Sequence, residues 1–202
     1  MGENALIVIG LTGKYCAGKN HVASLLEQRN LEVIDVDALG HDALERSKDE
    51  LTALFGRRII DSDGTVNRQI LGEIVFSDQR SLATLEGTVH PRMVQLCVQQ
   101  IEQYRAEGRV GVVVNAALLH RMHLDAVCDT VCFVKAPLIV RLARAMQRDQ
   151  ATIQSFFSIA RSQRDITIGM VRGSNSVYIM KNWGRTTFIH RQVDEFCATM
   201  GL

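Results

Sequence analysis

Residues 10–26 read GLTGKYCAGKNHVASLL, and this stretch contains the pattern that decides the fold. Within it, Gly13, Gly18 and Lys19 fit the G-x-x-x-x-G-K part of a phosphate-binding loop. In such a loop, backbone N–H groups converge on phosphate oxygens, helped by the N-terminus of the following helix. An apolar run at residues 5–11 precedes the loop, and apolar side chains at helical spacing follow it. A strand, a glycine-rich turn and a helix in this order predict a nucleotide-binding site.

Asn20 occupies the position after Lys19 where this motif normally has Ser or Thr. The hydroxyl of that residue coordinates Mg²⁺ directly. An amide oxygen is also a neutral hard ligand, but it lies one bond further from the backbone. Because Mg²⁺ readily keeps waters in its coordination shell, we expect Asn20 to contact the ion directly or through a bound water. Lys14, inside the loop, adds a positive charge beside the phosphates.

The composition is that of an ordinary globular protein. The chain has 202 residues, 47% of them apolar and 22% charged, with a net charge of +1. This predicts one domain, with room for a small insertion, and gives no reason to expect binding to nucleic acid or to a membrane. The N-terminal run lacks the basic residues of a signal peptide, and the five cysteines are odd in number and scattered. We therefore expect reduced thiols and a cytoplasmic location.

Four further segments have the composition of strands. They are residues 31–37, 110–119, 129–137 and 176–182. Helical patterns separate them, and a C-terminal amphipathic helix with Ile189, Val193, Phe196 and Met200 follows the last one. Strands interleaved with helices predict a doubly wound α/β sheet, which binds ligands at the carboxyl ends of its strands. That edge should hold the loop, Asp35, Asp37 and Asn115.

Residues 38–108 lack a clear strand pattern and are mostly helical in period. Asp63-Gly64 within this segment is a turn signal. We interpret His90-Pro91-Arg92 as the start of another helical stretch.

Asp35 and Asp37 are the carboxylates expected nearest to the loop. On a strand both would lie on one face, with Val36 on the other. Phosphoryl transfer needs a carboxylate that receives the proton of the acceptor hydroxyl, so one could serve the hydroxyl and the other the metal. Asp also caps helices, so the two could instead stabilise the start of the next helix.

Three arginines, Arg141, Arg144 and Arg148, lie on one predicted helix. Arg144 and Arg148 are four residues apart and share a face. Guanidinium groups suit ATP phosphates and the charge that develops during transfer. The spacing fits a solvated basic face equally well.

With these elements in order, the chain resembles the dephospho-CoA kinase family, P-loop kinases of the nucleoside-monophosphate-kinase type. The resemblance runs almost from end to end and rests on four stretches. They are IGLTG…AGK (residues 9–19), VIDVDALGH (33–41), FGRRIIDSDGTVNRQILGEIVF (55–76) and HPRM (90–93). VVVNAALL, RAMQRD and YIMKNWG then follow in the family's order. The elements of the middle segment are more selective than the loop, and they separate this family from adenylate, guanylate and shikimate kinases.

The resemblance implies a three-layer αβα fold of the P-loop NTPase type with a five-stranded parallel sheet. Its core would comprise residues 1–37, 109–144 and 174–202, with a helical acceptor-binding part at 38–108 and a helical lid at 145–173. The family transfers the γ-phosphate of ATP to the ribose 3′-hydroxyl of dephospho-CoA, the last step of CoA synthesis. The implied partners are ATP with Mg²⁺ and dephospho-CoA, and the implied enzyme is cytoplasmic and a monomer or weak homo-oligomer.

The resemblance also assigns roles to individual residues. Asp37 would be the base on the 3′-hydroxyl, supported by Asp35, and Lys19 and Arg144 would assist catalysis. The acceptor would also meet His41, Arg68, His90 and Leu118. ATP would be held by Gly13, Lys14, Tyr15, Cys16, Ala17, Gly18, Lys19, Asn20, Arg144, Arg148 and Asn182.

The chain also departs from the family's pattern. The family's Pro-Leu-Leu-Phe-Glu is replaced by Ala117-Leu118-Leu119-His120-Arg121, so a base stands where an acid is expected. Ser176-Val177 replaces Ala-Asp, and Ser158 stands in place of a lid arginine, with Arg161 nearby. Two alternatives therefore stay open: a nucleotide-binding regulatory relative without turnover, and a kinase of the same fold that acts on another small hydroxyl acceptor.

Overall fold

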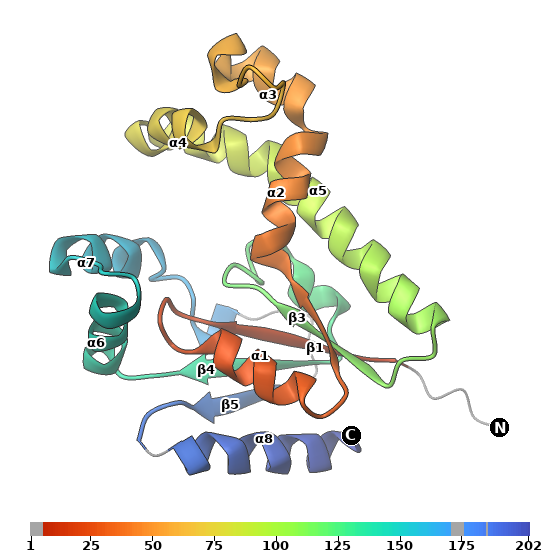
Figure 1. The fold of residues 1–202 in the computed structure, drawn as a ribbon. Helices are drawn as coiled ribbons and strands as arrows, with labels where there is room; N and C mark the ends of the chain where they lie inside the picture. Colours follow the sequence, from red (N-terminus) through yellow and green to blue (C-terminus); the bar gives the residue numbers. More distant parts are fainter. Residues whose placement is uncertain (1–5, 171–175, 185) are drawn as a thin grey trace. The chain divides into compact units, whose positions relative to one another are not determined.

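The computed structural model describes residues 6–170, 176–184 and 186–202 (Figure 1). The chain forms two compact units. The sheet unit comprises Met1–Asp35 and Ile101–Leu202, and the helical unit comprises Val36–Gln100. The phosphate-binding motif belongs to the sheet unit, and the segment with the family's most selective motifs belongs to the helical unit.

The sheet unit is built on five parallel strands in the order β2-β3-β1-β4-β5. Their bounds are β1 Ile7–Gly13, β2 Glu32–Asp35, β3 Gly111–Asn115, β4 Thr130–Lys135 and β5 Val177–Lys181. Every residue of β3 is buried, which explains why its sequence is apolar without alternation. The predicted five-stranded parallel sheet of a three-layer α/β fold is confirmed.

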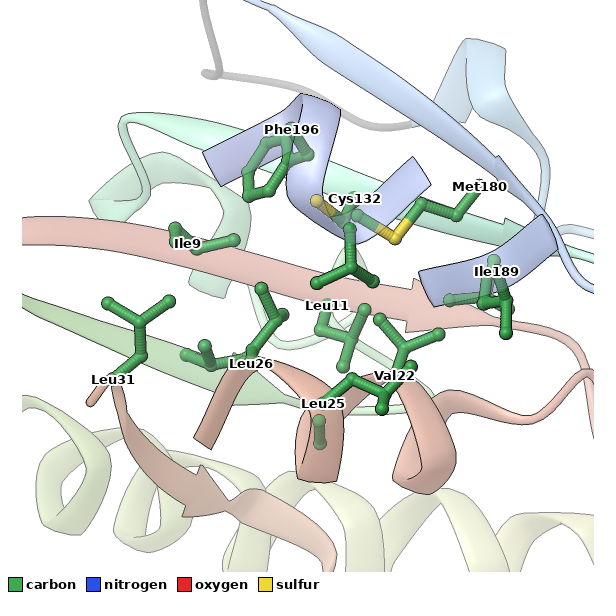
Figure 2. Packing of buried hydrophobic residues seen from close by; sticks show 14 of the residues in the cluster. Ile9, Leu11, Val22, Leu25, Leu26, Leu31, Cys132, Met180, Ile189 and Phe196 are labelled. Atoms are coloured by element: carbon green, nitrogen blue, oxygen red, sulfur yellow. The ribbon is translucent and has the colours of Figure 1, made fainter. Parts of the chain in front are cut away.

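One face of the sheet packs against two helices, α1 (Lys19–Glu27) and α8 (Thr186–Met200) (Figure 2). α1 contributes Val22, Leu25 and Leu26 to this core, at the spacing predicted from the sequence. From α8 come Ile189, Val193 and Phe196, while Met200 packs at the margin. The sheet supplies Ile9, Leu11, Val113, Cys132, Val134 and Met180. The predicted C-terminal amphipathic helix is therefore confirmed.

The remaining helices of the sheet unit follow β3 and β4. A short 3₁₀ turn, η2 (Leu124–Val127), lies between these strands. After β4 come α6 (Leu138–Arg148), α7 (Ile153–Ser162) and a 3₁₀ turn, η3 (Ile168–Met170). Residues 171–173 of the predicted lid lie outside the described residues.

The helical unit contains α2 (Val36–Arg46), α3 (Lys48–Phe55), η1 (Arg57–Ile59), α4 (Arg68–Ser77) and most of α5 (Gln79–Ala106). The Asp63-Gly64 turn is confirmed, because Ile60 and Val66 form an antiparallel bridge around it and Gly64 has a φ of +83°. Asn67 caps α4, its side chain accepting a hydrogen bond from the backbone N–H of Ile70.

Two local predictions are wrong. β2 ends at Asp35 and α2 begins at Val36, so Asp37 lies in the first turn of a helix and not on the strand. A carboxylate is favourable there because it faces the positive end of the helix dipole. His90-Pro91-Arg92 does not begin a helix either. Pro91 lies inside α5, which starts at Gln79.

Within the described parts of the chain, none of the helices combines the length and the apolar character that crossing a bilayer demands.

Replacing Phe196 by Ala should lower the free energy of unfolding by about 3–5 kcal/mol, because the buried ring fills space between α8 and the sheet. Phe157→Ala is the matched control. Its ring is 47% exposed, so we expect a loss of about 1 kcal/mol or less. Urea denaturation measures both losses. Equal losses would show that Phe196 does not support this layer.

Candidate functional site

The loop between β1 and α1 is shaped by two glycines with positive φ, Gly13 (+155°) and Gly18 (+96°). A Cβ at Gly13 would lie 2.4 Å from the carbonyl oxygen of Val134, and one at Gly18 would lie 2.0 Å from Nδ2 of Asn182. Neither contact is sterically possible. The loop therefore needs glycine at both positions, for backbone conformation and for close approach to β4 and to the end of β5.

Inside the loop, the backbone N–H of Ala17 donates to the carbonyl of Lys14 at 2.9 Å. The Lys19 ammonium donates to the carbonyl of Gly13 at 3.4 Å, so it lies at the start of the loop. α1 begins at Lys19, and the positive end of its dipole adds to the lysine charge. This geometry is that of an anion-binding loop.

Arg144 and Asn182 hold the loop from outside. Arg144 donates to the carbonyl of Ala17 at 3.2 Å and to the carbonyl of Asn182 at 3.0 Å. The side-chain amide of Asn182 donates to the same Ala17 carbonyl at 2.9 Å. The sequence predicted both residues as ATP contacts. The structure places them beside the loop, where they fix its backbone.

A cavity of about 330 Å³ opens beside Arg144 and Asn182. Arg148 and Gly18 also line it, together with Trp183, whose indole offers a flat apolar surface. Sequence reasoning missed Trp183. The sequence shows only that the single tryptophan follows Asn182 directly, and this position does not by itself identify a surface for a nucleotide base. The volume and mixed lining are those of a small-ligand site.

A polar cluster next to this cavity consists of Tyr15, Asp149 and Arg148, and Arg148 is part of the cavity lining. The hydroxyl of Tyr15 donates to Asp149, and Arg148 donates to the same carboxylate at 2.7 Å. These bonds hold the pKa of Asp149 well below its usual range, Arg148 having the larger effect. The bond to Asp149 raises the pKa of Tyr15 above its ordinary value. Asp149 thus stays ionised at neutral pH and orients Arg148.

Asn20 is paired with a second amide, because Asn115 Nδ2 donates to Asn20 Oδ1 at 3.2 Å. Asn115 ends β3 and is in register with Asp35 on β2 and Leu11 on β1. Its own Oδ1 is buried and has no hydrogen-bond partner among the described residues. Amide and carboxylate oxygens are ligands of Mg²⁺, and they accept hydrogen bonds from its bound waters. The side chains present at this edge therefore fit a Mg²⁺ ion that arrives with ATP.

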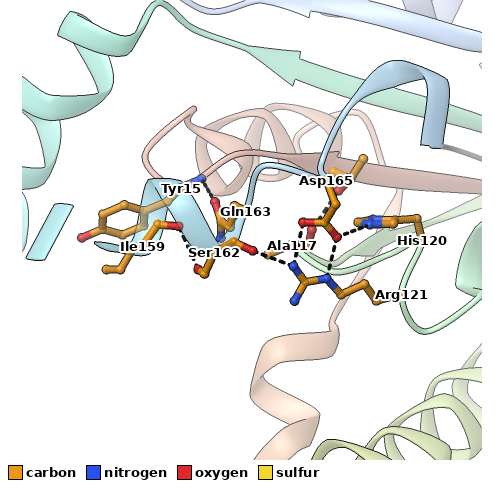
Figure 3. A network of polar contacts seen from close by, with 9 residues as sticks. Tyr15, Ala117, His120, Arg121, Ile159, Ser162, Gln163 and Asp165 are labelled. Atoms are coloured by element: carbon orange, nitrogen blue, oxygen red, sulfur yellow. Dashed lines mark hydrogen bonds and ion pairs between the residues drawn. The ribbon is translucent and has the colours of Figure 1, made fainter. Parts of the chain in front are cut away.

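Arg121 ties the loop after β3 to the segment after α7 (Figure 3). Its guanidinium donates two bonds of 2.7 Å to Asp165 and one of 2.6 Å to the carbonyl of Ser162. His120 shares the same carboxylate at 2.8 Å. Further along, the side chain of Gln163 accepts a bond of 2.6 Å from the backbone N–H of Tyr15. The basic residue at position 121 thus has a carboxylate partner within this chain.

The helical unit holds four of the predicted acceptor residues around one cavity of about 320 Å³. Asp37, His41, Arg68 and His90 line it, and the Arg68 guanidinium contacts the His41 ring. Apolar side chains complete the lining, including Leu44, Leu71, Val75, Val89 and Met93. The other two predicted acceptor residues belong to the sheet unit, Asp35 at the end of β2 and Leu118 in the turn after β3.

Asp165→Asn should lower the free energy of unfolding at pH 7 by about 1–2 kcal/mol, because Arg121 and His120 lose a shared, partly buried carboxylate. Arg121 holds the pKa of Asp165 below its ordinary value. The stabilisation is therefore complete above the unfolded-state pKa of about 4 and is lost as the pH falls towards the folded-state value.

Thermal unfolding at several pH values measures this effect. Glu102→Gln is the control, since it removes one negative charge from an exposed pair with Arg105 and should cost about 0.5 kcal/mol or less. If both variants lose the same stability at pH 7, the Asp165 cluster is no more than a surface ion pair.

Comparison with known proteins agrees with this geometry. A family model described as dephospho-CoA kinase matches residues 7–184. The dephospho-CoA kinase of Halalkalibacterium halodurans is 33% identical over 163 residues, covering 79% of this chain and 81% of that protein. The crystal structure of TT1252 from Thermus thermophilus is similar with a TM-score of 0.79 at 27% identity, over 97% of this chain and 98% of that one. Dephospho-CoA kinase from Campylobacter jejuni shares the fold, with a TM-score of 0.64 at 21% identity over 96% of each chain. The chain belongs to the dephospho-CoA kinase family.

Proposed function

We propose that this protein transfers the γ-phosphate of ATP to the ribose 3′-hydroxyl of dephospho-CoA, giving CoA and ADP. Membership of the dephospho-CoA kinase family is the observation that carries the proposal. The two alternatives were regulation without turnover and a kinase with another acceptor. The similar proteins are named dephospho-CoA kinases, so they favour neither alternative.

The sheet unit supports ATP as the phosphate donor. The loop amides and Lys19 would hold the phosphates, and the cavity lined by Trp183 and Arg148 would hold the base and ribose. Arg144 and Asn182 would keep the loop carbonyls turned away from the phosphates, because both donate to the Ala17 carbonyl. Because these bonds fix the loop before ATP binds, little binding energy is lost in reorganising it. The loop donors are then already in position to stabilise the transition state.

The helical unit supports an acceptor with both charged and apolar parts. In its cavity, Arg68, His41 and His90 offer donors for phosphate oxygens, and Leu71, Val75 and Met93 offer an apolar surface. Dephospho-CoA combines a diphosphate with a long uncharged arm, so this lining matches its chemistry. Leu118 and Asp35 would complete the acceptor contacts.

Asp37 is the proposed general base. It is exposed in the first turn of α2 and lines the helical unit's cavity. Only one residue separates it in sequence from Asp35, the last residue of β2. Asp37 would take the proton of the 3′-hydroxyl as that oxygen bonds to the γ-phosphorus and ADP leaves with the bridging oxygen.

Mg²⁺ is part of this proposal. Bound with ATP, the ion would neutralise charge on the β- and γ-phosphates. Asn20 and Asn115 would hold it through their amide oxygens or through its waters, with Asp35 at the same edge. In the part of the chain that the structure describes, no three carboxylate, imidazole or thiol ligands gather at one place, so phosphate and water would supply most of the coordination.

We also infer that the protein acts in the cytoplasm as a monomer or weak homo-oligomer. All five cysteines are free and buried, which suits a reducing compartment.

ADP formation by the purified protein with ATP, Mg²⁺ and dephospho-CoA tests the function, with the acceptor-free reaction as control. Acceptor-dependent ADP together with CoA would establish it. ATP binding without turnover would favour a regulatory protein, and ADP formed only with nucleosides or shikimate would favour another acceptor.

Asp37→Asn should lower kcat by about 10²–10⁴-fold, because the amide cannot accept the hydroxyl proton. The affinity for ATP should be unchanged, and equilibrium binding of ATP checks this. Asp42→Asn is the matched control, since it removes an exposed carboxylate from the same helix and should leave kcat within about twofold. Turnover near the wild-type rate in Asp37→Asn would eliminate it as the base.

Asn20→Ser should change turnover by less than about threefold and lower the Mg²⁺ concentration needed for half-maximal rate, because the serine hydroxyl can bind the ion directly. Rates measured across a Mg²⁺ series at saturating ATP test this expectation. A collapse of activity would show that the bond between Asn20 and Asn115 is itself required.

A further inference from the structure

A second cavity in the sheet unit, of about 310 Å³, shares no lining residue with the proposed nucleotide cavity. Its charged lining consists of three cations, Lys14, Lys135 and Arg141, with the polar residue Thr167 beside them. The apolar lining is Ala17, Phe133, Val134, Ala136, Ile166 and Ile168. None of its lining residues carries a negative charge. The charged groups of its lining are therefore all positive, beside an apolar wall.

Arg141 is the unusual member of this set, because the residue is only 5% exposed. Its Nε donates to the carbonyl of Tyr15 at 2.8 Å, and its guanidinium lies 5.6 Å from the centre of the Phe156 ring. Among the described residues its buried Nη2 has no hydrogen-bond partner, and no carboxylate forms an ion pair with it. A buried, unpaired charge is costly unless something compensates it.

The surroundings of Arg141 increase this cost. It lies in the first turns of α6, where the dipole of the helix repels a cation. Lys135 lies just before that helix, and neither the Lys135 ammonium nor the Lys14 ammonium forms a hydrogen bond or ion pair with a described residue. Burial lowers the pKa of the guanidinium from its ordinary value, in line with a missing counter-charge.

A purely structural role accounts for only part of this arrangement. Supporting the Tyr15 carbonyl needs one donor, and the Phe156 ring under the guanidinium stabilises the charge only in part. Neither contact supplies a counter-charge, pairs the buried Nη2, or accounts for two lysines around the same cavity. A bound anion would satisfy all of these groups together.

We propose that this cavity binds the phosphate group of a small molecule at Lys14, Lys135 and Arg141, in addition to the ATP held by the loop. A phosphate dianion matches several converging cations better than a single carboxylate does, and Thr167 offers a further hydroxyl donor. Phe133, Ile166 and Ile168 would contact the organic part of a phosphate ester. The ligand source is therefore either free phosphate or a phosphate monoester with an apolar substituent.

Calorimetric titration of inorganic phosphate and of phenyl phosphate into the full chain tests the proposal. The protein is first saturated with β,γ-methylene-ATP, so that all three phosphate positions of the loop are filled. We expect one further site that weakens as salt is added. Tighter binding of phenyl phosphate would identify a monoester as the source, and equal binding would identify the free anion.

Lys135→Met and Arg141→Met should each weaken this site by about tenfold, since each removes a charge-assisted contact. Arg105→Met is the control, because it removes an exposed charge elsewhere and should leave the affinity unchanged. If Arg141→Met fails to fold, Lys135→Met alone decides the result. Absence of a site in the analogue-saturated protein, competition between phosphate and the analogue, or unchanged affinity in Lys135→Met would overturn the proposal.

Discussion

The proposed nucleotide site depends on the hydrogen bonds that the carbonyl oxygen of Ala17 accepts. This oxygen accepts hydrogen bonds from Arg144 on α6 and from Asn182 at the end of β5. These bonds join three segments that are far apart in the sequence, and both donors are parts of the proposed nucleotide cavity. The shape of the loop and the shape of the cavity are therefore set together. A change at Arg144 would disturb both, even where it touches no ligand.

Local patterns made the loop and the sheet predictable. The Gly13–Lys19 motif is contiguous, and each strand is an apolar run that remains apolar when both of its faces are covered. Asp37 was placed wrongly because Val-Ile-Asp-Val has the composition of a strand, whereas the chain turns into α2 at Val36. At a strand–helix junction the period changes from two to 3.6, and a stretch this short cannot show which period applies.

The rest of the site depends on long-range contacts that no local pattern contains. The spacing of Arg141, Arg144 and Arg148 gives one helix but does not tell which arginine is buried. Phe156, on the next helix, covers Arg141, and Asp149 pairs with Arg148. Likewise, Arg121 stands where the family's pattern has an acid, and its carboxylate partner in the fold is Asp165. The partners of Arg141 and Arg121 lie 15 and 44 residues away, whereas Asp149 is adjacent to Arg148 and also binds Tyr15, 134 residues away.

The bond between Tyr15 and Gln163 carries a consequence for communication within the sheet unit. A backbone N–H can serve one strong acceptor at a time, and in this arrangement the N–H of Tyr15 serves Gln163. The same N–H belongs to the loop whose amides are the proposed donors for phosphate. A phosphate oxygen that takes it must displace Gln163, which lies two residues from the Asp165 anchor. Binding of a phosphate to the loop would therefore affect the position of the segment after α7, because the phosphate oxygen and Gln163 compete for the same N–H.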